Sequence, residues 1–161
     1  MDERHSKLAP DLIAAYKNTL FQAHVGDDVI TLKVGERCEA LGSLFTGHSV
    51  TSACYITAYN PFGRLLTPQE NDERNNSLKA EVSLIYPTYE GVGVDPKGEW
   101  EGEASLLVMG CSEDVSHDLG VKWEQNAVVF VGANLTPRLL FLVELYVSLP
   151  RKSTMRNLIN L

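Results

Sequence analysis

The sequence predicts an α/β fold, or its α+β variant, in which helices cover a single mixed sheet of about five to seven strands. Apolar residues recur at helical spacing in some segments and alternate, or run continuously, in others. These helical and extended segments are interleaved along the chain, which is typical of helices packed on one sheet. The tetrapeptide Asp95-Pro96-Lys97-Gly98 has the residue order of a type I turn and predicts an antiparallel hairpin around it.

Length and composition indicate one globular domain. The chain has 161 residues, of which 44% are hydrophobic and 22% charged, and this excludes disordered, collagen-like and rod-like chains. We expect a single domain over residues 1–149 and a short basic and apolar tail over 150–161. Apolar runs such as 139–143 fall far short of the roughly 20 residues that cross a bilayer. No signal sequence is recognisable, so we expect a cytoplasmic location.

Four elements are predicted in the first part of the chain. A helix is expected to begin at Pro10, a favoured first helical position, and to bury Leu12, Ile13, Tyr16 and Leu20. Alternation over residues 29–34 predicts a strand, and residues 36–45 predict a short helix. Residues 51–59 are apolar on both faces, which indicates a central strand of a sheet covered on both sides.

The next helix has the clearest start signal. Thr67 is the expected N-cap, Pro68 the first helical residue, and Glu70 completes a capping box, with the helix running to about Ile85. Ser112 is expected to cap a later helix that Gly120 ends. The remaining predicted elements are strands at residues 99–108, 127–131 and 139–147.

The cysteines and histidines do not predict a metal site. Three widely spaced cysteines form no CxxC pair, and four histidines show neither HxH nor HExxH spacing. The chain also lacks the GxGxxG and GxxxxGK[ST] patterns of common nucleotide-binding loops. We therefore predict no metal and no cofactor.

Polar residues gather where the strand at 51–59 ends. The apolar stripe of the following helix, with Leu78 and Val82, continues at its N-terminal end to Asn71 and Arg74, which therefore need polar partners. Ligands of open α/β sheets bind beyond the carboxyl ends of strands, and helix N-termini favour anions. We expect a small polar or anionic ligand to bind among Thr57, Asn60, Arg64, Asn71 and Arg74. Alternatively, these side chains are solvated, and Asn60-Pro61 is only a turn.

The hairpin carries a second polar cluster. If its outgoing arm is a strand, Glu99, Glu101, Glu103 and Ser105 share one face. A crowded carboxyl group can have a raised pKa and act as a general acid or base, and Glu103, nearest the core, is the candidate catalytic residue. A solvated acidic face is the alternative. Residues 90–118 hold eight acidic residues and one lysine, so their net charge of −7 equals that of the whole chain. Whether this acidic segment lies next to the ligand site is a question for the structure.

Three segments of the chain share a distinctive set of motifs. Residues 56–78 hold ITAYNP and an Asn-x-x-Arg helix, residues 91–110 hold WEGEAS, and residues 124–131 begin with EQNA. Together they resemble the signature blocks of a family of small bacterial proteins, domain-of-unknown-function family 3293. The matching positions are Thr57, Asn60, Asn71, Arg74, Trp100, Gly102, Glu103, Ser105, Gln125 and Asn126. One departure is Gly63, before Arg64, where the family pattern has a small hydroxyl residue. The resemblance implies that these residues belong together but implies no reaction.

Two classes of function remain open. In the first, a small-ligand enzyme or sensor uses Asn60, Asn71 and Arg74 to bind a polar or phosphorylated group and Glu103 as acid or base. Gln125 and Asn126 add two amides at a strand entrance, and the alternative role of these amides is to hydrogen-bond the loop backbone. In the second, a non-catalytic protein-interaction or regulatory module docks another protein through its sheet or its acidic face. The negative net charge argues against nucleic acid, and no membrane partner is expected. A pocket that unites Asn60, Asn71, Arg74 and Glu103 would favour the first class, and separated, solvated side chains would favour the second.

Overall fold

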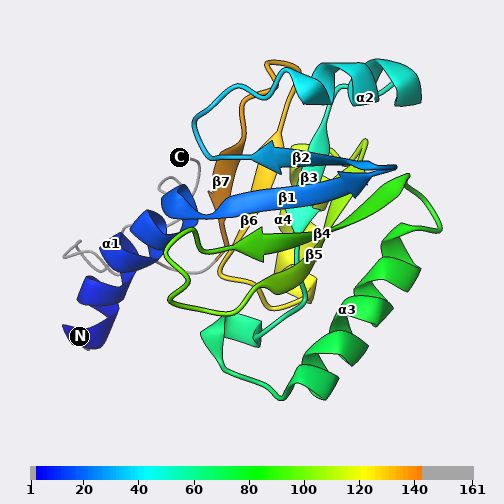
Figure 1. Cartoon of the computed structure of the whole chain (residues 1–161). Coiled ribbons are helices and arrows are strands. Elements are labelled where there is room, and N and C mark those ends of the chain that lie inside the picture. The colour runs from blue at the N-terminus through cyan, green and yellow to red at the C-terminus, as the bar shows by residue number, and fades with distance from the viewer. Residues whose placement is uncertain (1–2, 143–161) are drawn as a thin grey trace.

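The computed structural model describes residues 3–142, which form one seven-stranded sheet with helices on both faces (Figure 1). The strand order is β2-β1-β4-β5-β3-β6-β7. The predicted tail at 150–161 and the end of the last predicted strand lie outside the described residues. The elements are α1 Glu3–Asn18, β1 Leu20–Val25, β2 Asp28–Leu32, α2 Ala40–His48, β3 Ala53–Ile56, η1 Pro61–Gly63, α3 Pro68–Val82, β4 Thr88–Val94, β5 Glu103–Met109, α4 Glu113–Lys122, β6 Ala127–Val131 and β7 Arg138–Phe141.

Every pair of neighbouring strands within residues 3–142 is antiparallel. The predicted arrangement of helices on one sheet, with a hairpin around Asp95–Gly98, is confirmed, and the sheet has the largest number of strands expected. It is not mixed, however. Hairpins join β1 to β2 and β4 to β5, and β3 lies between β5 and β6, with both of which it pairs antiparallel. The α+β variant of the prediction therefore describes the fold.

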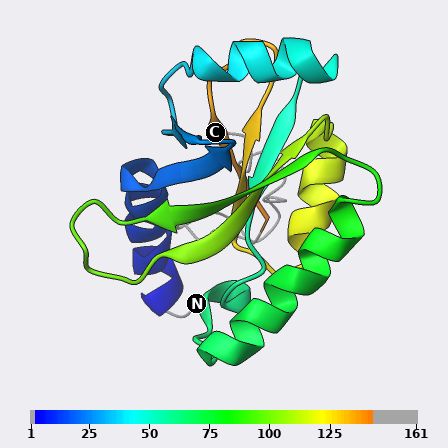
Figure 2. The ribbon, with the colours of Figure 1, turned by 45° about the vertical axis from the view of Figure 1, so that its right-hand side comes forward.

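The strand β3 lies near the centre of the sheet and is buried on both faces, as its continuous apolar run predicts. One face, which includes Tyr55, packs against α1 and α2. The other face, which includes Cys54 and Ile56, packs against α3 and α4. Figure 2 shows α1 on one side of the sheet and the paired helices α3 and α4 on the other. The sheet that contains β3 is thus the middle layer between two layers of helices.

The turn between β4 and β5 forms as its sequence predicts. The backbone N–H of Gly98 donates to the carbonyl of Asp95 at 3.0 Å, and Gly98 has φ +69°, which glycine adopts without strain. The Asp95 carboxylate also accepts from the backbone N–H of Lys97 and of Glu99. Because these bonds hold Glu99 in the turn, β5 begins only at Glu103. The four residues 99–102 are an exposed loop, not part of a strand.

The helix α3 begins at its predicted capping box. The Thr67 hydroxyl accepts from the backbone N–H of Glu70, and the Glu70 carboxylate accepts from the backbone N–H of Thr67. The helix ends at Val82, three residues before the predicted end. Its buried side chains are Asn71, Asn75, Leu78 and Val82. Two asparagines therefore point inward at its N-terminal half.

Other element boundaries differ from the prediction. The helix α1 begins at Glu3, with Pro10 in its interior, and β1 directly follows it, so that Leu20 lies in a strand. The helix α4 continues past Gly120 to Lys122, and the glycine is needed there because a Cβ atom would clash with Val128 and Leu142. Within the described part of the chain, no helix combines the length and apolar character that crossing a bilayer requires.

Candidate functional site

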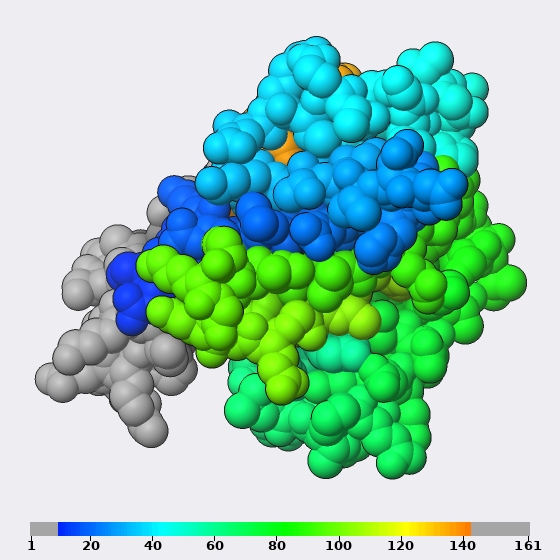
Figure 3. Space-filling model, in the orientation of Figure 1, coloured from blue at the N-terminus to red at the C-terminus, as the bar shows by residue number. Residues whose placement is uncertain are grey.

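A cavity of about 260 Å³ lies where β3 ends and β5 and β6 begin, on the face of the sheet that α1 covers. Residues from α1, β1, the loop after β3, β5 and β6 line it. In the space-filling view, the yellow-green connection between β4 and β5 lies between the blue N-terminal residues and the green-teal segment after β3 (Figure 3). Segments from both halves of the chain therefore meet at this cavity.

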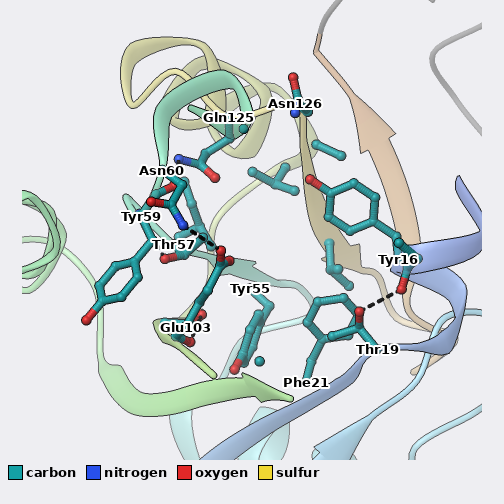
Figure 4. Close-up of a pocket in the computed structure, with 18 of the residues that line it drawn as sticks. Tyr16, Thr19, Phe21, Tyr55, Thr57, Tyr59, Asn60, Glu103, Gln125 and Asn126 are labelled. Carbon is teal, nitrogen blue, oxygen red and sulfur yellow. Dashed lines mark hydrogen bonds between the residues drawn. The ribbon is translucent and has the colours of Figure 1, made fainter. Parts of the chain in front are cut away.

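Glu103 is the acidic residue of the cavity. It is partly buried at the start of β5, and Nδ2 of Asn60 donates to its Oε1 at 3.1 Å (Figure 4). Burial raises the pKa of the Glu103 carboxyl above its ordinary value, and the hydrogen bond from Asn60 offsets part of this rise. The acidic hairpin and the predicted ligand site thus meet at this pair of side chains. Glu99 and Glu101 lie in the exposed loop.

Asn60 is held by an unusual number of hydrogen bonds. Its backbone has φ +46°, a left-handed conformation that asparagine tolerates better than most residues. Its backbone N–H donates to Oδ1 of Asn71 at 2.8 Å, while its own Oδ1 accepts from Nδ2 of Asn71 at 2.9 Å and from the backbone N–H of Leu66 at 3.0 Å. The buried Asn71 therefore does not line the cavity but orients Asn60, which in turn orients Glu103.

The two arginines predicted for the site do not line the cavity. Arg74 donates from Nε to the carbonyl of Ala58 at 2.8 Å and from Nη2 to the carbonyl of Trp123 at 2.9 Å, and its Nη1 lies 3.6 Å from Oε1 of Glu124. Its guanidinium therefore joins the end of β3 to the end of α4. Arg64 is exposed in the loop before α3. Neither cation is placed to bind an anion in the cavity.

Three further predicted residues line the cavity. The Thr57 hydroxyl donates to the carbonyl of Ala104 at 2.7 Å and accepts from the backbone N–H of Tyr59, so both of its hydrogen-bonding roles are used within the protein. Nε2 of Gln125 donates to the carbonyls of Tyr59 and Trp123, each at 3.1 Å. Among the described residues, the side chain of Asn126 has no hydrogen-bond partner. The structure therefore brings together Thr57, Asn60, Glu103, Gln125 and Asn126.

Comparison with known families adds one finding. The model of the family described as a protein of unknown function, DUF3293, matches residues 56–128. Over this segment the chain is similar to the DUF3293 family. The matched segment contains every residue predicted for the site, and it runs from the end of β3 to the start of β6. No significant match was found among curated proteins or among solved structures.

The DUF3293 segment supplies the polar half of the cavity, and the chain before it supplies much of the aromatic half. Tyr16 of α1 and Phe21 of β1 stand across the cavity from Glu103 (Figure 4). The rings of Phe21 and Tyr55 pack edge to face, with centroids 5.2 Å apart. Burial raises the pKa of the Tyr16 hydroxyl, and the negative charge of Glu103 raises it further.

Sequence reasoning missed this aromatic wall because β1 was not predicted. Tyr16 was recognisable only as an apolar residue of the first helix, and nothing in its spacing separates a cavity wall from ordinary core. Tyr59 also lines the cavity, but its ring points away from it (Figure 4), and its hydroxyl donates to Asp72. Burial and this hydrogen bond raise the pKa of Tyr59 to about 12. Across residues 3–142, no three His, Cys, Asp or Glu side chains are grouped to hold a metal ion.

Proposed function

We propose that this domain binds a small polar molecule in the cavity at the end of β3, and that Glu103 accepts a hydrogen bond or a proton from it. The observation that supports this most strongly is the placement of Glu103. Its carboxylate is partly buried beside aromatic rings and is held by Asn60 in a cavity large enough for a small molecule. A carboxyl group whose pKa is raised by burial is suited to general acid–base work.

The proposal narrows the two classes of function that the sequence leaves open. An anionic ligand has little support, because Arg64 and Arg74 lie outside the cavity and the carboxylate of Glu103 lies inside it. The protein-interaction module remains the alternative, with Glu99 and Glu101 on an exposed loop and not on one acidic strand face. The cytoplasmic, bacterial setting predicted from the sequence remains part of the proposal, with a small metabolite as the ligand.

Two measurements test ligand binding. Native mass spectrometry of protein purified gently from its own host should show a retained small molecule. NMR titration with neutral, cationic and anionic polar fragments should shift the side-chain amide signals of Asn60, Gln125 and Asn126. If no ligand is retained, and no fragment shifts these signals at millimolar concentration, the proposed function is wrong.

Two adjacent alanines of α1 provide matched variants for the same titration. Both alanines are exposed, but Ala15 lines the cavity and Ala14 does not. The substitution Ala15→Leu should reduce fragment binding by filling the cavity, while Ala14→Leu should leave it unchanged. Leucine and alanine are both good helix formers, so neither substitution should disturb α1. Equal binding by both variants would place the ligand somewhere else on the molecule.

A further inference from the structure

The described part of the cavity wall carries one acidic side chain and no basic one. Among the described residues that line it, Glu103 is the single Asp or Glu, and no Lys, Arg or His contributes. Of the predicted cations, Arg74 is already bonded to two carbonyls and lies near Glu124. A carboxylate removed from water is costly unless a positive charge accompanies it. An occupant that carries a positive charge would provide that missing partner.

The rest of the cavity suits an apolar body attached to such a charge. Tyr16, Phe21 and Tyr55 present aromatic rings to the space beside Glu103 (Figure 4). The faces of aromatic rings carry partial negative charge and attract organic cations. A divalent metal ion fits less well, because Mg²⁺ and Ca²⁺ need several oxygen ligands and the described walls hold one carboxylate.

The hydrogen bonds of Glu103 leave room for a ligand. Asn60 occupies Oε1, and Oε2 has no hydrogen-bond partner among the described residues. An ammonium or amidinium N–H directed at Oε2 would form a charge-assisted hydrogen bond, which is about twice as strong as a neutral one. The Asn126 amide, also without a partner among the residues described, lines the same cavity and offers both a donor and an acceptor.

We propose that the cavity binds an organic monocation, an amine or amidine on a compact apolar body, with its nitrogen against Oε2 of Glu103. This inference rests on the proposed function and adds the charge of the ligand to it. The cavity volume of about 260 Å³ corresponds to roughly nine water molecules. A molecule of the size of benzylamine is therefore a suitable probe.

The test compares three probes of nearly equal shape: benzylamine, benzyl alcohol and benzoate, which are cationic, neutral and anionic at pH 7. Binding to the full chain is followed by NMR through the side-chain amide signals of Gln125 and Asn126. We expect benzylamine to bind roughly tenfold more tightly than benzyl alcohol, because its ammonium forms an ion pair with the Glu103 carboxylate, whereas the alcohol donates a hydrogen bond without a charge of its own. Benzoate should bind more weakly than either.

Charge-neutral variants identify the group responsible. The substitution Glu103→Gln should weaken benzylamine binding roughly tenfold and weaken benzyl alcohol binding by a smaller factor, because only the amine loses an ion pair. The substitution Glu101→Gln, two residues away in the exposed loop, removes the same charge and should change neither affinity. In the wild-type protein, benzylamine affinity should fall as the pH drops through the pKa of Glu103, whereas Glu103→Gln should show no such fall.

Several results would overturn the inference without touching the proposed function. Equal affinities for benzylamine and benzyl alcohol, tighter binding of benzoate, or an undiminished benzylamine affinity in Glu103→Gln would each show that the ligand charge was assigned wrongly. Failure of all three probes, when other fragments shift the same signals, would do so too. The proposed function itself fails only if no fragment of any charge binds in the cavity.

Discussion

At the scale of single residues, the site depends on a chain of three side chains. Asn71 fixes Asn60 through two hydrogen bonds, and Asn60 fixes the carboxylate of Glu103 through a third. Asn60 also adopts a left-handed backbone conformation, and such strain persists only where surrounding contacts enforce it. The residue that contacts the ligand in our proposal is therefore positioned by a residue of α3 that does not line the cavity.

The substitution Asn71→Ala should remove this support. It leaves the backbone N–H and Oδ1 of Asn60 each short of a partner, and we expect a loss of about 2 kcal/mol in the free energy of unfolding. Chemical denaturation measures this loss. The control is Asn76→Ala, because Asn76 is exposed on the same helix and should change stability by less than about 0.5 kcal/mol. Similar losses in the two variants would contradict the positioning role of Asn71.

Glu103 should also make stability depend on pH in a predictable direction. Burial raises the pKa of Glu103 in the folded protein above 4.5, its ordinary value in the unfolded chain. At a pH between the unfolded and the folded pKa, the folded protein therefore holds a proton that the unfolded chain has lost. Stability therefore falls as the pH rises through this window, and the cost persists at neutral pH. Glu103→Gln should be more stable than wild type at pH 7, and the difference should vanish below pH 4.5.

Thermal denaturation across this pH range measures the effect. The glutamine Oε1 can still accept the hydrogen bond from Asn60, so the comparison isolates the charge. Glu101→Gln, in the exposed loop, should leave the pH profile unchanged. A stability difference at position 103 that stays constant from acid to neutral pH would show that the carboxyl is not desolvated in the folded protein.

At the scale of elements, α3 is both a structural support and the source of the positioning residue. Its first turn is closed by the reciprocal Thr67–Glu70 bonds, and Arg74, two turns along, bonds the end of β3 and the end of α4. These contacts set where the loop after β3 lies and so where Asn60 lies. Changes at the start of α3 should therefore reach the cavity.

The substitution Thr67→Ala should cost about 1 kcal/mol, the usual effect of losing an N-cap hydroxyl. Urea denaturation measures this cost. Ser77→Ala is the control, because Ser77 is exposed in the middle of the same helix, where alanine is favourable. A Thr67→Ala protein as stable as Ser77→Ala would mean that the capping box does not hold the helix start.

Elements with a strong local signal were predictable, and those fixed by tertiary contacts were not. The capping box, the Asp95 turn and the buried run of β3 each carry their structure in a few adjacent residues. The end of α4 could not be predicted, because Gly120, usually a helix stop, is retained by packing against Leu142. The strand β1 was missed because it follows α1 with almost no intervening turn.

The same distinction applies to the site. The proximity of polar residues at the end of β3 follows from the predicted sheet edge and the helix start. The partners of Arg74 do not, because backbone carbonyls such as those of Ala58 and Trp123 have no signature in the sequence. The prediction of an anionic ligand assumed that Arg74, as an inward-facing arginine, needs a partner from outside the protein. In the structure Arg74 instead donates to main-chain carbonyls of the protein itself.

At the scale of the whole molecule, close contacts between distant strands hold the aromatic wall in place. A Cβ atom at Gly91 in β4 would lie 1.8 Å from the carbonyl oxygen of Gln22 in β1, so only glycine fits there. This approach seats β1, with Phe21, against the sheet beside the site. The N-terminal part of the cavity therefore depends on a residue of the DUF3293 segment.

The substitution Gly91→Ala should separate β1 from β4 and cost about 3 kcal/mol. Hydrogen exchange should show faster exchange of the β1 amides, and fragment binding in the cavity should weaken. Gly47→Ala is the control, since Gly47 lies in α2 with open space around its Cα, and alanine there should maintain or raise stability. Unchanged protection of β1 in Gly91→Ala would show that the strands tolerate a wider spacing.

The position of β3 in the sheet also affects how the protein folds during its synthesis on the ribosome. Both strands that flank it are made later, because β5 begins at residue 103 and β6 at residue 127. Until then, a fully apolar strand has two unpaired edges, the state in which strands most readily join those of other chains. Translation that stops before residue 127 would leave one edge of β3 open, so nascent chains of this protein should depend on chaperones until β6 has been synthesised.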